Sequence, residues 1–170
     1  EPTYKNYSFS ISEDTTNNLE QFARQNRITL NTLLKGTWGL LLSHYFGEKE
    51  VVFGTTVSGR FADFPSIDGM TGLFMNVLPT RIQWHKNETI GDWLKTVQAQ
   101  SMATNDFDQS NLEEITTWIN WPKHMPLFDS LFVFGNFLKD GLEEGELTVE
   151  DFQGGFSSNY PLTIHINPKA

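Results

Sequence analysis

The stretch LNTLLKGTWGLLLSHYFGEKEVVFG, residues 30–54, decides the fold class because it passes from a helical pattern to an extended one. Apolar residues recur at spacings of three and four in its first part, which predicts a largely buried helix that ends at Gly47. The predicted buried stripe consists of Leu30, Leu33, Leu34, Thr37, Trp38, Leu41, Leu42 and Tyr45. Strand-forming residues follow from Val51, and Gly54 among them indicates close approach of another backbone or a ligand.

Helical and extended patterns alternate along the rest of the chain. Ser12 and Thr89 are predicted N-caps of helices that run to about Asn26 and about Asn105, and a short helix is expected near 111–118. Strands are predicted, by alternation or by continuous apolar runs, at 4–11, 51–54, 77–84, 131–134, 147–152 and 162–166. The run at 131–134 is apolar throughout, which favours a central strand. This order predicts an α/β fold, a two-layer sandwich with a mixed β-sheet and flanking helices.

Composition excludes several classes of function. Twelve basic residues stand against 21 acidic ones, so a net charge of -9 would repel nucleic acid. The chain has no cysteine, and therefore no disulfide, thiolate metal site or thiol nucleophile. No apolar run approaches the roughly 18 residues that span a bilayer, and the first residues lack the pattern of a signal peptide. We therefore expect a cytoplasmic chain of one globular unit, with no membrane contact.

No short motif for catalysis, metal binding or nucleotide binding is present. The four histidines are His44, His85, His124 and His165. None of them forms a zinc-binding pair at the usual helical spacing. Ser58 precedes a glycine but does not complete the hydrolase pattern G-x-S-x-G. Asp106, Asp108 and Ser110 imitate the start of a calcium loop, yet Asn111 occupies the place of its glycine, so a turn role is favoured. We predict no catalytic residue and no metal ligand.

Two segments combine glycines with polar side chains at expected strand ends, VVFGTTVSGR at 51–60 and TGLFMNVLPTR at 71–81. Their glycines leave space for the close approach of another group, and their Ser, Asn and Arg side chains can form hydrogen bonds. This profile fits the wall of a channel. It also fits two glycine-bearing turns with a capping Asn and a surface Arg, and the residues alone leave both readings open.

These two segments, followed by PLFDSLFVFGNF at 126–137 and SNYPLTI at 158–164, resemble successive motifs of the condensation domains of nonribosomal peptide synthetases. The resemblance covers nearly the whole chain in order. It implies one lobe of the chloramphenicol acetyltransferase-like fold, in which two α/β lobes form a V around a tunnel. It also implies amide bond formation between aminoacyl or peptidyl thioesters, which two carrier proteins deliver on phosphopantetheine arms.

The catalytic signature of that family, His-His-x-x-x-Asp-Gly, is absent from this sequence, and in the family it belongs to the N-terminal lobe. We therefore expect residues 1–170 to be the C-terminal lobe alone, truncated at its C-terminal end, forming one wall of the tunnel and inactive without its partner lobe. The expected partners are that N-terminal lobe and peptidyl carrier proteins. No cofactor is expected on this chain, because the phosphopantetheine belongs to the carrier. An isolated lobe would expose apolar surface, which predicts dimerisation or aggregation.

Two other readings stay open beside this one. The first is a noncatalytic module that binds carriers or neighbouring domains of a megasynthase. The second is a stand-alone acyltransferase that uses His165 as its base. An upstream His-His-x-x-x-Asp-Gly in the parent polypeptide would favour the condensation reading over both.

Matched motif by motif, the resemblance assigns the tunnel wall to Ser58, Gly59, Arg60, Gly72, Phe74, Asn76 and Arg81. Gly72, Phe74 and Asn76 occupy the fixed places of the family motif Gly-x-Phe-Val-Asn-Thr, with Val77 in place of the threonine. Asn76 is the main candidate to face the tunnel. Its replacement by alanine in a complete domain is expected to reduce product formation and leave folding nearly intact.

Overall fold

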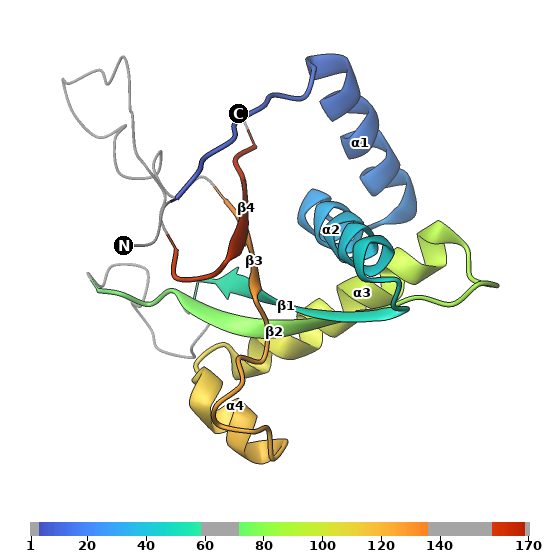
Figure 1. The fold of residues 1–170 in the computed structure, drawn as a ribbon. Coiled ribbons are helices and arrows are strands. Elements are labelled where there is room, and N and C mark those ends of the chain that lie inside the picture. The colour runs from blue at the N-terminus through green and yellow to red at the C-terminus, as the bar shows by residue number, and fades with distance from the viewer. Residues whose placement is uncertain (1–3, 59–71, 136–157, 169–170) are drawn as a thin grey trace.

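The computed structural model describes residues 4–58, 72–135 and 158–168, and within them it confirms an α/β fold with a mixed sheet. The helices are α1 (Glu13–Asn26), α2 (Leu30–Phe46), α3 (Ile90–Thr104) and α4 (Leu112–Trp118), with a 3-10 turn at Asn105–Phe107. The strands are β1 (Glu50–Val57), β2 (Asn76–Gln83), β3 (Ser130–Phe134) and β4 (Leu162–Ile166). They lie in the order β2-β1-β3-β4, with β1 and β2 antiparallel and the other neighbours parallel (Figure 1).

The helix boundaries follow from local capping chemistry, as predicted. The Ser12 and Thr89 hydroxyls accept hydrogen bonds from the backbone N–H groups of Thr15 and Asp92, at 3.3 and 3.2 Å. Gly47 ends α2 with a φ of 71°, a left-handed conformation that glycine adopts without strain. The expected short helix is α4, which starts after the cap Asn111.

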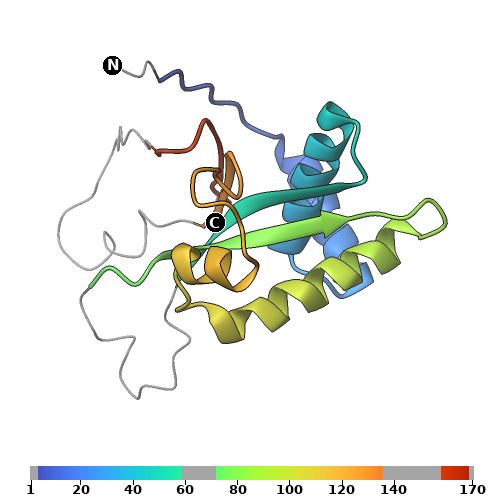
Figure 2. The ribbon, with the colours of Figure 1, turned by 60° about the horizontal axis from the view of Figure 1, so that its bottom comes forward.

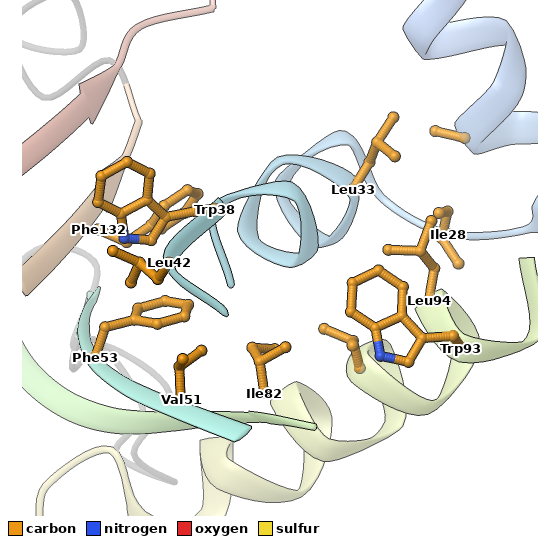
Figure 3. Packing of buried hydrophobic residues seen from close by; sticks show 12 residues of the cluster. Ile28, Leu33, Trp38, Leu42, Val51, Phe53, Ile82, Trp93, Leu94 and Phe132 are labelled. Atoms are coloured by element: carbon orange, nitrogen blue, oxygen red, sulfur yellow. The ribbon is translucent and has the colours of Figure 1, made fainter. Parts of the chain in front are cut away.

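The main core lies between the sheet and the layer formed by α1, α2 and α3. Phe53, Ile82 and Phe132 project from three different strands into it and are almost completely buried. Trp38 of α2 packs beside them, and Trp93 and Leu94 of α3 extend the cluster under the other end of α2 (Figure 3). The Trp38 Nε1–H donates to the Ser130 hydroxyl at 3.2 Å, so the buried indole keeps a hydrogen-bond partner.

The buried face of α2 differs from the predicted stripe. Thr37, Leu41 and Tyr45 were expected inside, yet all three are exposed, Tyr45 to 84%. Lys35 is buried instead, where desolvation lowers its pKa and its ammonium donates to the Ser101 hydroxyl at 3.2 Å. The helix is therefore rotated relative to the prediction, because hydrophobicity alone did not show which side comes closest to its neighbours.

Two glycines explain that rotation. A Cβ atom on Gly39 would lie 2.7 Å from the side chain of Ile82, and one on Gly36 would lie 2.7 Å from Leu94 Cδ2. Real Cβ atoms do not pack so closely, so α2 approaches β2 and α3 only because these positions carry no side chain. The small residues, and not the leucines alone, define the inner face of the helix.

Other sequence-based expectations had mixed outcomes. The central place of the strand at 131–134 is confirmed, because β3 lies between β1 and β4. Although a proline cannot donate to a sheet, Pro79 is tolerated in β2 because that strand is an edge of the described sheet. The predicted strand at 147–152 lies outside the described residues. No helix in the described ranges is long and apolar enough to cross a bilayer.

The strand predicted at 4–11 is wrong. Residues 4–12 form neither helix nor strand, and Tyr7 and Phe9 are 85% and 82% exposed. Alternation of apolar and polar residues favours an extended chain, but a strand also needs a neighbour for its backbone N–H and C=O groups. The segment pairs with neither described edge of the sheet, β2 or β4.

Replacement of Gly39 by alanine tests the close approach of α2 to the sheet. We expect Gly39→Ala to lower the free energy of unfolding by about 1–3 kcal/mol, because the new methyl group overpacks against Ile82. This loss should exceed the gain of about 1 kcal/mol that alanine brings to a helix interior. Thr37→Ala, on the exposed side of α2, is the control and should change stability little. A Gly39→Ala protein as stable as wild type in urea denaturation would show that α2 does not depend on this contact.

Candidate functional site

The antiparallel hairpin of β1 and β2 brings several predicted tunnel residues to one end of the sheet. Val57 at the end of β1 pairs with Asn76 at the start of β2. Ser58 follows that pair directly, and Gly72 and Phe74 precede it in the chain. Figure 2 shows β2 crossing the molecule from this end to the loop before α3. We call Ser58 together with residues 72–76 the hairpin end.

Two further predicted residues follow Ser58 directly in the chain. Gly59 and Arg60 lie outside the described residues, so their assignment to the tunnel wall stays a prediction.

Asn76 uses its side-chain amide to hold a neighbouring turn. Its Nδ2 donates to the backbone carbonyls of Asp108 and Ser110, both at 2.8 Å. Its Oδ1 accepts the N–H of Val77, also at 2.8 Å. An asparagine amide has two N–H groups, so both of its donors are already used within the protein. Asn76 therefore joins the start of β2 to the turn between α3 and α4.

This arrangement corrects one part of the prediction for Asn76. The side chain satisfies two carbonyls of a partly buried turn, so its removal should affect folding as well as any activity. Whether Asn76 also faces the tunnel stays a prediction. The bonding partners of Asn76 lie more than 30 positions away in the chain, and no local pattern could have named them.

Gly72 and Phe74 form a local contact at the hairpin end. A Cβ on Gly72 would lie 3.0 Å from Phe74 Cε2, so the half-buried ring folds back over the glycine. The glycine therefore makes room for a side chain of its own segment. Leu73 is fully exposed and Met75 is about half exposed, which leaves apolar surface at this place.

Arg81 lies away from the other candidates. It pairs with Val52, five residues along β2 from Asn76, which corresponds to about 17 Å of strand. Its guanidinium donates to both carboxylate oxygens of Glu50, at 2.7 and 2.9 Å. This hydrogen-bonded pair holds the pKa of the Glu50 carboxyl below its ordinary value of 4.5. Both side chains are exposed, so the pair adds little to stability and does not bring Arg81 to the hairpin end.

An aromatic stack lies over β1 near the hairpin end. A Cβ on Gly54 would overlap with Phe128 Cε2, so the ring of Phe128 rests directly on this glycine. Tyr160 stacks on Phe128 with ring centroids 5.4 Å apart and an interplanar angle of 24°. Gly54 was expected to admit a backbone or a ligand, and its close neighbour is an aromatic side chain. The signal for it was present in the motifs at 126–137 and 158–164, but nothing in them showed which atoms would meet.

His165 lies on a different strand from the residues of the hairpin end. It is an exposed residue of β4, and β4 is the sheet edge opposite β2. His44, His85 and His124 are also exposed, on α2 and in loops. The structure therefore gives no support to a catalytic base at His165 acting with the hairpin end.

Comparison with known proteins defines the class to which this fold and its motifs belong. A family model described as Condensation domain matches residues 2–170. The chain belongs to the condensation domain family, as the resemblance predicted.

The relatives found among curated proteins are named as synthases. One of the linear gramicidin synthase proteins of Brevibacillus parabrevis is 40% identical over 163 residues, which are 95% of this chain and 3% of that protein. Chondramide synthase cmdD of Chondromyces crocatus is 37% identical over 174 residues, 99% of this chain and 4% of that protein. The chain thus spans only a few per cent of the length of these relatives.

Solved structures agree on the fold. The condensation domain of the Monacolin K polyketide synthase MokA aligns with a TM-score of 0.63 and 16% identity, over 74% of this chain and 30% of that one. The first condensation domain of the calcium-dependent antibiotic synthetase, solved with a substrate analogue, aligns with a TM-score of 0.60 and 15% identity, over 71% and 26%. These neighbours confirm the predicted chloramphenicol acetyltransferase-like fold.

Replacement of Asn76 tests its role in folding. We expect Asn76→Ala to lower the free energy of unfolding by about 1–3 kcal/mol, because two carbonyls lose their donor. Asn76→Asp should be more destabilising, since a carboxylate cannot donate and would face two carbonyl oxygens. Leu73→Ala at an exposed neighbouring position is the control. Denaturation curves of Asn76→Ala that coincide with wild type would show that the turn does not need this amide.

The Glu50–Arg81 pair gives a prediction on pH. Since the folded pKa of Glu50 is lowered, its contribution to stability is present above pH 4.5 and disappears as the pH falls through the folded pKa. In Arg81→Gln, NMR titration should find the Glu50 pKa raised toward 4.5. Asp92, whose pKa is lowered by Lys95 and Thr89, is the internal control and should not move. An unchanged Glu50 pKa in the variant would contradict the ion pair.

Proposed function

We propose that this chain is the C-terminal lobe of a nonribosomal peptide synthetase condensation domain and that its hairpin end forms part of one wall of the substrate tunnel. The observation that carries the proposal is the family match over residues 2–170 together with the gathering of family motif positions at one end of the sheet. The solved condensation domains are about three to four times longer than the part that aligns with this chain, which fits one lobe of a larger unit.

The proposed reaction joins an amine to a thioester. The acceptor amine attacks the carbonyl carbon of the donor thioester, a C–N bond forms, the C–S bond breaks, and the carrier thiol leaves. The amine must also lose a proton, which requires a base within hydrogen-bond reach. This chain has no His-His-x-x-x-Asp-Gly, and no histidine is among the described residues of the hairpin end. We therefore assign the base to another part of the domain and expect the isolated chain to be inactive.

The phosphopantetheine arm reaches the site as part of the substrate, held by a carrier protein. Such a thin arm needs apolar contacts along its length and space without bulky side chains. Exposed Leu73 and Met75 and the half-buried ring of Phe74 supply apolar surface of this kind. The N-terminal lobe of the same domain and two carrier proteins are the partners that this proposal requires.

An assay of amide formation tests the proposed function. Donor and acceptor carrier proteins loaded with aminoacyl thioesters are mixed with the parent condensation domain or with the 170-residue chain, and product is followed by mass spectrometry. The parent domain should form the amide, and the isolated chain should stay at the uncatalysed background. A parent domain that binds loaded carriers but forms no amide would favour the noncatalytic interaction module.

A matched pair of surface variants tests the location of the wall. Leu73→Glu places a charge at the hairpin end, and we expect kcat/KM of the parent domain to fall about ten-fold or more, since a desolvated charge is costly beside an apolar arm. Tyr45→Glu makes a similar change near the end of α2, next to the start of β1 and thus at the other end of the hairpin. It should leave kcat/KM unchanged. Equal effects of the two variants would contradict a wall at the hairpin end.

A further inference from the structure

Resting on the proposed function, we propose that Tyr160, held in place by Phe128 on Gly54, is a specificity-determining residue that contacts the apolar side chain of an aminoacyl substrate. The three residues come from three separate segments of the chain, and they meet at one place on the sheet.

The position of Phe128 is set by the missing side chain of Gly54. The point that a Cβ would occupy overlaps with Cε2 of the ring and lies 2.9 Å from its Cζ. Phe128 is itself only 6% exposed. Any side chain at position 54 would displace the ring, so glycine is what lets Phe128 lie directly on the backbone of β1.

Tyr160 takes its orientation from Phe128 and from its own segment. The two rings are nearly parallel, at 24°. The Ser158 hydroxyl accepts the backbone N–H of Tyr160 at 3.3 Å and is hydrogen-bonded to the Thr163 hydroxyl near the start of β4. A ring that stacks on a buried neighbour, on a backbone fixed by a hydrogen bond, has a restricted orientation, which is what a selective contact surface requires.

The stack adjoins the hairpin end. Val77 Cγ1 lies 2.9 Å from the same Cβ position on Gly54, so Val77 and Phe128 border the same space. Val77 directly follows Asn76, the main tunnel candidate. Successive side chains of a strand point to opposite faces, so the stack lies beside the hairpin end on the face of the sheet opposite to the Asn76 side chain.

The chemistry of Tyr160 indicates the class of group that it would contact. One face of its ring is covered by Phe128, and the residue is only partly buried, so part of its surface remains available. Burial raises the pKa of the Tyr160 hydroxyl, so the side chain is uncharged at neutral pH. A fixed, neutral aromatic surface favours aliphatic or aromatic groups over charged ones.

The test compares substrates of different size in the parent condensation domain. Alanyl, leucyl and phenylalanyl thioesters are supplied in turn on the donor or the acceptor carrier, with a glycyl thioester on the other, and kcat/KM is measured for each. In Tyr160→Ala we expect kcat/KM for leucyl and phenylalanyl substrates on one of the two carriers to fall about ten-fold, the loss of one aromatic contact, with the alanyl value within about two-fold of wild type.

Two further variants separate this role from a merely structural one. Tyr160→Phe keeps the ring and should retain the wild-type order of substrates. Phe128→Leu keeps apolar volume but removes the stacking partner, and it should give the same selective loss as Tyr160→Ala. Thermal unfolding is measured for each variant. A global loss of folding would lower the Tm and would reduce kcat/KM equally for all substrates.

The outcomes distinguish the two proposals. Amide formation in which Tyr160→Ala and Phe128→Leu leave the order of substrates unchanged would overturn the specificity role alone. A wild-type domain that accepts the alanyl thioester but neither the leucyl nor the phenylalanyl thioester would also overturn the specificity role of Tyr160. A wild-type domain that forms no amide from any of these thioesters would overturn the proposed function, and the role of Tyr160 with it.

Discussion

The close approach of α2 to β2 and α3 is the contact on which the rest of this structure depends. Gly36 and Gly39 allow the helix to come so near that any Cβ would overlap with Leu94 or Ile82. Because β2, α3 and α2 meet there, this contact fixes the helical layer relative to the strand that begins at the hairpin end. It also leaves Lys35 inside with a serine hydroxyl as its partner, a local penalty that the surrounding packing must offset.

The hairpin end combines a structural residue with exposed apolar surface. Asn76 is a structural residue in the described chain, because its two amide protons hold the turn at Asp108 and Ser110. The residues just before it present apolar surface to solvent. A rigid base with an exposed apolar rim is the arrangement expected of a wall that contacts a partner or a substrate. The solved members of the family are much longer than the part that aligns with this chain, which is consistent with such a contact.

Much of the fold could be predicted from local patterns. The caps at Ser12, Thr89 and Gly47 acted as expected, because capping depends on residues three or four positions apart. The central strand was recognisable from its continuous apolar run. The strand predicted at 4–11 was wrong because a strand depends on a hydrogen-bonding partner from elsewhere in the chain, which the segment itself does not contain. For the candidate site, the motifs named both Asn76 and Arg81, and the register of β2 sets Arg81 opposite Val52, where it pairs with Glu50.

The family, the α/β class and the residues that begin and end the helices can be read from the sequence, because motif order, hydrophobic period and capping are all properties of short segments. Packing between distant segments sets which side of α2 is buried, which carbonyls Asn76 binds and which ring fills the space above Gly54. Each of these depends on atoms from distant segments, Ile82 for α2, the 108–110 turn for Asn76, and Phe128 for Gly54. A contact between remote residues is a property of the packed chain, and the local pattern around either residue does not contain it.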